Sequence, residues 1–304
     1  EFYFYSAIPA FFCHLYFVTG HTGLTALLGS PVAHSISPLM HNESFRLLGL
    51  DYVYLCFDVN EETLPAAVAG LKTCGIRGFN LTMPNKNKIV ELLDDLSPEA
   101  QLIGAVNTVL NDNGKLIGYN TDGYGFMQSV RDAGHDITGK NITVMGVGGA
   151  SMAICAQSAL DGAASVHIFA RRTSRYWNRT QKFAENLSAK TGCQVCLFDN
   201  DDHTALRDSI AQSYLLINAT SVGMVPDIDD TIIKDTSLFH PELVVADVVY
   251  EPQETRLLRE AKAAGCQTFN GMYMLLHQGA KAFQIWTGQE MPVSVIKEKY
   301  FSVK

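Results

Sequence analysis

The sequence predicts an α/β protein of two domains, and three observations support this fold class. Its 304 residues are enough for two hydrophobic cores. Apolar runs of strand length alternate with segments of helical periodicity along nearly the whole chain. The string Gly146-Val147-Gly148-Gly149-Ala150-Ser151 follows the apolar run 142–145 directly, which is the strand, turn and helix order of a doubly wound sheet.

The first part of the chain predicts parallel strand–helix–strand units. Strands are expected at 24–29, 52–59 and 75–80, and helices at 38–48, 61–72 and 85–93. Pro98 occupies the first position of a further predicted helix, because proline is tolerated there. A strand at 105–110 ends at the turn Asn111-Asp112-Asn113-Gly114, which is typical of a hairpin.

A predicted helix beyond Asp122, at 123–133, leads to the second part, where the strand pattern repeats. Six strands are expected, at 141–145, 165–169, 194–198, 214–218, 243–247 and 267–269. Six strands with helices between them indicate a complete Rossmann-like, doubly wound nucleotide-binding domain. Helices at 272–287 and 292–300 follow the last strand and are expected to pack back on the first domain.

These elements divide the chain into a first α/β domain at 20–122, the Rossmann-like domain at 123–271 and C-terminal helices at 272–304. Residues 1–19 are crowded with Phe and Tyr and have no basic region before their apolar part. A secretory signal needs that region, and the apolar stretch is too interrupted to span a membrane. We interpret 1–19 as a leader or a cloning-derived extension, with an added edge strand as the alternative.

Composition excludes several classes of function. A net charge of -8 disfavours nucleic acid or an anionic membrane as partner, because both require a basic surface. The seven cysteines are odd in number and scattered, which favours reduced thiols in the cytoplasm over a disulfide framework. Cys193 and Cys196 have redox spacing but lie in a strand-like stretch, so we interpret them as structural. The nine histidines show no ligand spacing, and no metal is predicted. Nothing in the sequence indicates the oligomeric state.

The glycine string is the first chemical feature. Gly146, Gly148 and Gly149 allow a tight turn and bring the backbone N–H groups of a helix start close to a pyrophosphate. The alternative is a turn that serves packing alone. At the end of the next strand the loop 169–175 contains Arg171 and Arg172 and no acidic residue, which favours NADP over NAD. The alternative is that these arginines are solvated surface residues, and NAD use stays open.

Lys86 ends a second string, Asn80-Leu81-Thr82-Met83-Pro84-Asn85-Lys86, and is expected at the start of a helix. A lone lysine is usually a surface residue. Asn107 and Asp122 add an amide and a carboxylate near the domain junction, and Ser35 and Ser37 add two hydroxyls at a helix start. Such a group suits a polyhydroxylated acid. The alternative is that these polar residues cap helices and form turns.

Seven separated motifs make the chain resemble the shikimate dehydrogenase family, including its quinate/shikimate dehydrogenase branch. They are Gly29 to Pro38, Asn80 to Lys86, Asn107-Thr108, Asn120-Thr121-Asp122-Gly123, Gly146 to Ser151, Asn218-Ala219-Thr220-Ser221 and Gly271 to Gln278. They occur in the family's order from about Gly23 to the C-terminus.

The resemblance implies reversible hydride transfer between NADPH and the ring ketone of 3-dehydroshikimate, a step of aromatic amino acid biosynthesis. It implies that Lys86 is the acid/base lysine and that Asp122 is its partner, which also binds the substrate. The implied substrate contacts are Ser35, Ser37, Thr82, Asn107, Tyr250 and Gln278. The implied nucleotide contacts are Gly146, Gly148, Gly149, Ala150, Ser151, Arg171, Arg172, Thr220, Val248 and Gly271.

Three hypotheses follow from this resemblance. The first is an NADP-linked shikimate dehydrogenase, which Thr82 favours. The second is a quinate/shikimate dehydrogenase that uses NAD or NADP. The sequence Met83-Pro84-Asn85-Lys86 and the pair Arg171-Arg172 resemble that branch. Thr173 argues against it, because that branch often has an acidic residue at this position. The third is a non-catalytic nucleotide-binding paralogue, against which the presence of both Lys86 and Asp122 argues.

Overall fold

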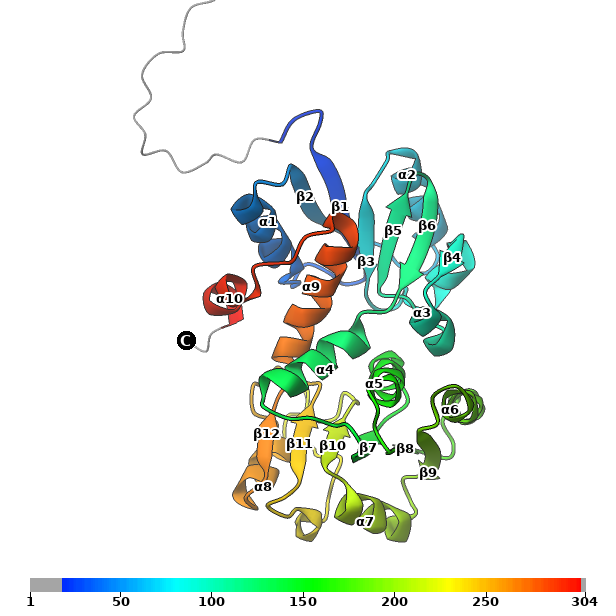
Figure 1. Ribbon diagram of the computed structural model, residues 1–304, viewed down its shortest axis with the longest axis vertical. Coiled ribbons are helices and arrows are strands. Elements are labelled where there is room, and N and C mark those ends of the chain that lie inside the picture. The colour runs from blue at the N-terminus through cyan, green and yellow to red at the C-terminus, as the bar shows by residue number, and fades with distance from the viewer. Residues whose placement is uncertain (1–17, 302–304) are drawn as a thin grey trace, which may run out of the picture.

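The computed structural model describes residues 18–301, so the prediction for 1–19 falls almost wholly outside the described residues. Two six-stranded sheets lie one above the other in Figure 1, and the helices α4 (Asp122–Asp132) and α9 (Met272–Thr287) run in the region that joins them. This arrangement confirms the predicted α/β fold. No helix within 18–301 is long and apolar enough to cross a membrane.

The first sheet is mixed, with strand order β2-β1-β3-β5-β6-β4. Its strands are β1 (Gly23–Gly29), β2 (Tyr52–Asp58), β3 (Gly78–Leu81), β4 (Asp95–Leu96), β5 (Thr108–Asp112) and β6 (Lys115–Tyr119). The strands β1, β2 and β3 are parallel, whereas β5 and β6 form the predicted antiparallel hairpin. Its turn residues Asn113 and Gly114 both have positive φ, as a hairpin turn of two residues requires. The helices of this part are α1 (Ser37–Leu48), α2 (Leu64–Thr73) and α3 (Pro98–Ile103).

The predicted helix 85–93 is wrong in its first half. Pro84 to Asn87 form a turn, and only a short 3-10 helix, η1 (Lys88–Leu92), follows. The carbonyl of Lys86 accepts a hydrogen bond from Val106 N at 2.8 Å, so it does not serve a helical turn. The side chain of Asn85 is buried and donates to Val59 O at 2.7 Å. These tertiary bonds fix the backbone around Lys86 more firmly than a frayed helix start would.

The second sheet is wholly parallel, with strand order β12-β11-β10-β7-β8-β9. Its strands are β7 (Asn141–Met145), β8 (Ser165–Ala170), β9 (Gln194–Asp199), β10 (Leu215–Asn218), β11 (Val244–Asp247) and β12 (Gln267–Phe269). Its helices are α5 (Gly149–Leu160), α6 (Trp177–Thr191), α7 (His203–Gln212) and α8 (Arg256–Ala263), and the 3-10 turn η2 (Thr236–Leu238) precedes β11. The strand order reverses between β7 and β10, where a doubly wound sheet binds its ligand.

The C-terminal helices return to the first sheet, as predicted. Phe283 and Trp286 of α9 share a core with Phe45 and Tyr54, and Trp286 Nε1 donates to Val109 O at 2.9 Å. The chain then forms α10 (Val293–Ile296) and a π-helical turn, Lys297–Phe301. α9 therefore contacts the first sheet while also packing along α4, which places both helices at the junction of the two sheets.

A buried carboxylate at the end of β11 gives the stability a pH dependence. Asp247 is inaccessible to solvent, and burial raises its pKa from 3.8 to about 6, although its three partners, Asn218, Val249 and Thr255, stabilise the charge with uncharged donors. The folded protein therefore holds a proton at a pH where the unfolded chain has released it. This group lowers stability as the pH rises from about 4 through about 6.

Asp247→Asn removes that titration, which can be tested by urea denaturation at two pH values. Relative to the variant, the wild type is expected to lose about 1 kcal/mol of unfolding free energy between pH 5 and pH 7. The comparison cancels any effect of the substitution that does not depend on pH. An equal stability difference at both pH values would contradict the raised pKa.

Candidate active site

Two cavities meet where the carboxyl ends of the strands of both sheets face each other. The larger is a cleft of about 1660 Å³ along the second sheet, and the smaller is a pocket of about 280 Å³ against the first sheet. Both are lined by His34, Ala150, Val248 and Tyr250, so they are continuous. A dinucleotide in the larger cleft and a small molecule in the pocket would therefore be neighbours.

A lysine and a carboxylate line the smaller pocket. Lys86 Nζ lies 2.6 Å from Asp122 Oδ2, with 26% of the lysine side chain and 7% of the aspartate side chain exposed. Asp122 begins α4, where the helix dipole stabilises a carboxylate, and its backbone N–H donates to Asn120 Oδ1 at 3.1 Å. The side chain of Asp122 is thus held in place, and Lys86 keeps enough exposure to reach a bound molecule.

Asn107 lies behind this pair and does not line the pocket. Its Nδ2 donates to Asp122 Oδ1 at 2.8 Å and approaches Gln278 Oε1 at 3.4 Å, while its Oδ1 accepts from Thr121 N at 2.8 Å. The side chain is buried. Asn107 therefore ties together the start of α4, strand β5 and helix α9, and it fixes the carboxylate that contacts Lys86.

Hydroxyl groups form the other side of the pocket. Ser35 and Ser37 line it at the start of α1, and Ser37 N donates to Ser35 Oγ at 3.2 Å. Thr82 lines it just after β3, with its backbone N–H bonded to Leu28 O at 3.1 Å. Hydroxyl and amide hydrogens at a helix start can bind a carboxylate or ring hydroxyls.

Two further side chains line the pocket, one from α9 and one from the loop after β11. Gln278 projects from α9, and its Nε2 donates to Leu275 O at 2.9 Å. Tyr250 follows β11 and lines both cavities, and burial raises the pKa of its phenol, so it enters the site as a neutral hydrogen-bond donor. Gly271 lies beside them, where a Cβ atom would be 2.1 Å from Val248 O, so glycine allows this close approach.

The glycine turn fits the pyrophosphate of a dinucleotide. Gly146 has φ +111°, and a Cβ there would lie 2.8 Å from Thr220 Cγ2. Gly148 and Gly149 have no neighbour within 4 Å on the side where a Cβ would stand, and no side chain caps the start of α5. Its first N–H groups are therefore open to an anion in the cleft. Ser151 is buried behind the turn and donates to Gly146 O at 2.5 Å, so it supports the turn from within.

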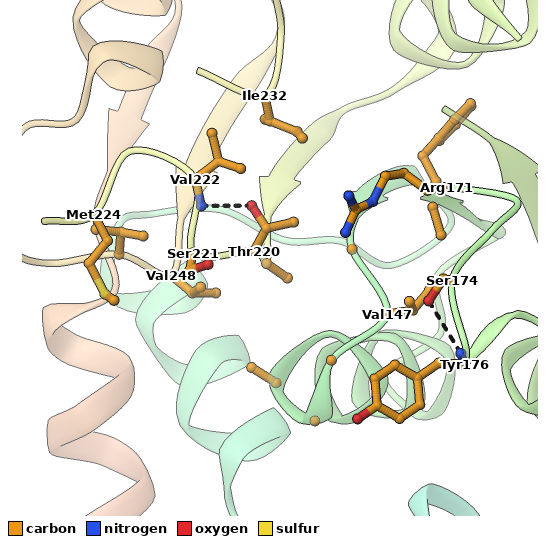
Figure 2. A pocket seen from close by; sticks show the side chains of 18 of the residues that line it. Val147, Arg171, Ser174, Tyr176, Thr220, Ser221, Val222, Met224, Ile232 and Val248 are labelled. Atoms are coloured by element: carbon orange, nitrogen blue, oxygen red, sulfur yellow. Dashed lines mark hydrogen bonds between the residues drawn. The ribbon is translucent and has the colours of Figure 1, made fainter. Parts of the chain in front are cut away.

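The two adjacent arginines after β8 diverge. Arg171 extends into the cleft opposite Thr220 and Val222 (Figure 2). The guanidinium of Arg172 instead stacks on Trp177, 4.6 Å from the ring centroid, and does not line the cleft. Arg175 does line it, and its Nη2 donates to Tyr176 OH at 2.5 Å. The second arginine that lines the cleft is therefore Arg175. The sequence had indicated Arg172 instead, the residue next to Arg171.

Most of the predicted site residues gather at the two cavities. The pocket is lined by Ser35, Ser37, Thr82, Lys86, Asp122, Tyr250, Gly271 and Gln278, the cleft by Gly146, Gly148, Gly149, Ala150, Arg171, Thr220, Val248 and Tyr250, whereas Asn107, Ser151 and Arg172 line neither. His34 and Met83 line the cleft without having been assigned a role. Both belong to motifs from which other site residues were predicted, Gly29 to Pro38 and Asn80 to Lys86. Their position within these motifs is the signal that could have identified them.

Comparison with known proteins gives the same picture. Residues 27–109 match the family model of the shikimate dehydrogenase substrate binding domain, and residues 271–299 match that of the shikimate 5'-dehydrogenase C-terminal domain. The chain is 52% identical over 284 residues to a shikimate dehydrogenase (NADP(+)) of Listeria innocua, which covers 93% of this chain and 97% of the relative.

Solved structures agree with the sequence matches. A shikimate 5-dehydrogenase from Listeria monocytogenes in complex with shikimate and NAD has a TM-score of 0.89 at 51% identity, covering 92% of this chain and 97% of the other. A quinate dehydrogenase from Corynebacterium glutamicum in complex with NAD has a TM-score of 0.82 at 31% identity, covering 93% and 99%. With identity above 30% over nearly the full length of its relatives, the chain belongs to the shikimate dehydrogenase family.

Proposed function

We propose that the protein is a shikimate dehydrogenase that reversibly reduces the ring ketone of 3-dehydroshikimate with NADPH. The observation that carries this proposal is the Lys86–Asp122 pair in a small pocket that opens into a dinucleotide-sized cleft. A redox enzyme of this kind needs a proton donor beside the carbon that receives the hydride. The relatives named as NADP(+)-dependent shikimate dehydrogenases support the same activity.

Lys86 transfers the proton in this proposal. NADPH, when bound, supplies the hydride to the carbonyl carbon. The ammonium group of Lys86 donates a proton to the carbonyl oxygen, which becomes the hydroxyl, and in the reverse direction the neutral amine accepts it. Asp122, held by Asn107 and the start of α4, orients the ammonium group and accepts a hydrogen bond from the substrate.

The remaining pocket residues bind and orient the substrate. Ser35 and Ser37 donate hydrogen bonds to its carboxylate, and Thr82, Gln278 and Tyr250 contact its ring hydroxyls. Asn107 acts on the substrate through Asp122, because it lies behind the pocket wall. A pocket of about 280 Å³ suits a single six-membered ring acid.

The cleft of the second sheet holds the dinucleotide. Gly146, Gly148, Gly149 and Ala150 bind the pyrophosphate at the start of α5, and Thr220 and Val248 line the opposite wall. Arg171 and Arg175 provide the positive charge that a ribose 2'-phosphate requires. We further propose that 20–122 with 272–304 forms the substrate unit and 123–271 the nucleotide unit, since each range contains one sheet.

The function is tested with purified protein, crossing shikimate and quinate with NADP+ and NAD+ and recording the absorbance of the reduced nicotinamide. Shikimate with NADP+ is expected to give the highest kcat/KM. Comparable turnover of quinate would favour the quinate/shikimate dehydrogenase branch. Absence of turnover with all four pairs would overturn both enzyme hypotheses and leave a nucleotide-binding paralogue.

Arg175→Ala is expected to raise the KM for NADP+ by about tenfold, because a charge-assisted hydrogen bond contributes roughly 1.5–3 kcal/mol. The KM for NAD+, which has no 2'-phosphate, is expected to change less than about twofold. Arg172→Ala is the matched control, since its guanidinium stacks on Trp177 outside the cleft. Steady-state kinetics with both cofactors measure this. If Arg172→Ala gave the larger loss for NADP+, the assignment of Arg175 would be wrong.

A further inference from the structure

Asp247 ends β11 and lies outside the lining of both cavities, yet it is bonded to the wall of the larger one. Its Oδ1 accepts hydrogen bonds from Val249 N at 2.9 Å and from Asn218 Nδ2 at 3.0 Å. Its Oδ2 accepts from Thr255 Oγ1 at 2.8 Å, and Thr255 caps the start of α8. One fully buried carboxylate therefore joins the end of β10, the loop after β11 and the start of α8.

Asn218 extends this network into the neighbouring loop. Its Nδ2 also donates to Val222 O at 3.1 Å, and its Oδ1 accepts from Thr220 Oγ1 at 2.6 Å and from Thr220 N at 3.1 Å. Val222 N donates in turn to Thr220 Oγ1 at 3.1 Å, the bond drawn in Figure 2. The loop 219–222 is thus fixed to Asn218, and Asn218 is fixed to Asp247.

Both loops form the second-sheet wall of the cleft. Residues 219–222 line it after β10, and residues 248–251 line it after β11. Figure 2 shows Thr220, Ser221 and Val248 together on one side, opposite Arg171. Since β10 and β11 are adjacent parallel strands, their two loops leave the sheet side by side, and Asp247 is the side chain that connects them.

We propose that Asp247 is a positioning residue that sets the affinity for the nicotinamide dinucleotide by holding the loops 219–222 and 248–251 in one arrangement. The inference rests on the proposed function, because it takes the cleft as the dinucleotide site. Loops that already have their bound arrangement lose little conformational entropy when the dinucleotide binds. Rigid loops therefore give a higher affinity for the dinucleotide. The smaller pocket is lined by only two residues of these loops, Val248 and Tyr250, so it depends less on this network than the cleft does.

The network requires hydrogen-bonding atoms at the positions of the two carboxylate oxygens of Asp247, and it does not require their negative charge. In Asp247→Asn the side-chain oxygen can still accept from Asn218 Nδ2 and Val249 N, while the new amide can donate to Thr255 Oγ1. Asp247→Ala leaves the Val249 N–H and the Thr255 hydroxyl without their partner and removes the side-chain bond to Asn218, so only the backbone bond from Val248 N to Asn218 O, 2.9 Å long, still joins the two loops there. The asparagine variant should therefore retain the arrangement that the alanine variant loses.

The test measures NADP+ binding by calorimetry, without turnover, and shikimate binding to the same proteins. Asp247→Ala is expected to raise the Kd for NADP+ by about tenfold, and Asp247→Asn by less than about threefold. Thr143→Val is the matched control, because Thr143 is buried in the same sheet, its hydroxyl bonds to Ser213, and it lies outside both cavities. It is expected to leave the Kd for NADP+ unchanged. In Asp247→Ala the Kd for shikimate is expected to change less than the Kd for NADP+, because only Val248 and Tyr250 of these loops line the smaller pocket.

The inference would be overturned if the wild type and Asp247→Ala bound NADP+ with equal affinity. It would also be overturned if Asp247→Asn or Thr143→Val lost as much NADP+ affinity as Asp247→Ala. If Asp247→Ala does not fold, Asp247→Ser replaces it, because serine keeps one hydroxyl acceptor. The Kd for NADP+ is again expected to rise, and an unchanged Kd would again overturn the inference. A wild-type protein that binds shikimate but no NADP+ would instead contradict the proposed function, so the two failures are distinguishable.

Discussion

Lys86→Ala is expected to lower kcat by about 10²-fold or more, because a positioned general acid contributes about 10²–10⁴-fold to proton transfer. Alanine removes the ammonium group that lies 2.6 Å from Asp122 Oδ2 and leaves no other lysine or arginine among the residues lining the pocket. Within the described residues the side-chain hydrogen bond of Lys86 is to Asp122, and Lys86 does not line the larger cleft. Affinity for NADP+, measured by calorimetry, should therefore stay within about twofold of the wild type.

The matched control is Lys88→Ala, two residues along the same segment. Lys88 pairs with Glu91 at the surface and lines neither cavity, so its removal should leave kcat nearly unchanged. Measurement in both reaction directions separates proton transfer from substrate binding, since loss of a proton donor affects kcat in each. Near-normal kcat for Lys86→Ala would exclude Lys86 as the acid/base group.

The centre of the second sheet could be predicted almost to the residue because its central strands are buried on both faces. β10 and β11 are short, mainly apolar runs that are buried throughout, and such runs leave little choice of structure. The segment 85–93 could not be predicted in the same way. Its conformation depends on hydrogen bonds from Val106 and to Val59, which are distant in sequence, and local helix signals carry no information about them.

In the candidate site, too, some features could be predicted from the sequence and others could not. Residue type and motif spacing indicated Lys86, Asp122 and the glycine turn, because the chemistry needs those groups. Side-chain direction was not predictable: Arg171 and Arg172 are adjacent, but the ring of Trp177 draws the second away from the cleft. Nor was Asp247 predictable as a connecting residue, since its role depends on β10 and β11 being neighbours in the sheet.

Gly125→Ala is expected to lower the free energy of unfolding by about 2 kcal/mol, because overpacking against a rigid neighbour costs roughly 1–3 kcal/mol. Its Cβ would lie 2.6 Å from Gln278 N and 2.7 Å from Met274 O, both in the backbone of α9, so no side chain can move aside. The other side of α4 is equally close, since a Cβ at Gly123 would lie 2.3 Å from Ala153 O of α5. α4 therefore has no direction in which to retreat without disturbing α5.

The same displacement should reduce activity, which separates Gly125 from an ordinary packing position. α4 begins at Asp122 and α9 carries Gln278, so moving the helices apart changes the distance between two pocket residues that we propose to contact the substrate. A shift on the order of 1 Å can cost up to about 10²-fold in rate, and kcat/KM for shikimate is expected to fall at least about tenfold. Gly70→Ala is the control, because Gly70 lies within α2 with no atom within 4 Å of its added Cβ. It should leave kcat/KM unchanged and raise stability by about 0.5–1 kcal/mol, since alanine favours a helix over glycine. If both variants behaved alike in urea denaturation and in kinetics, close contact between α4 and α9 would not be what holds Asp122 and Gln278 in place.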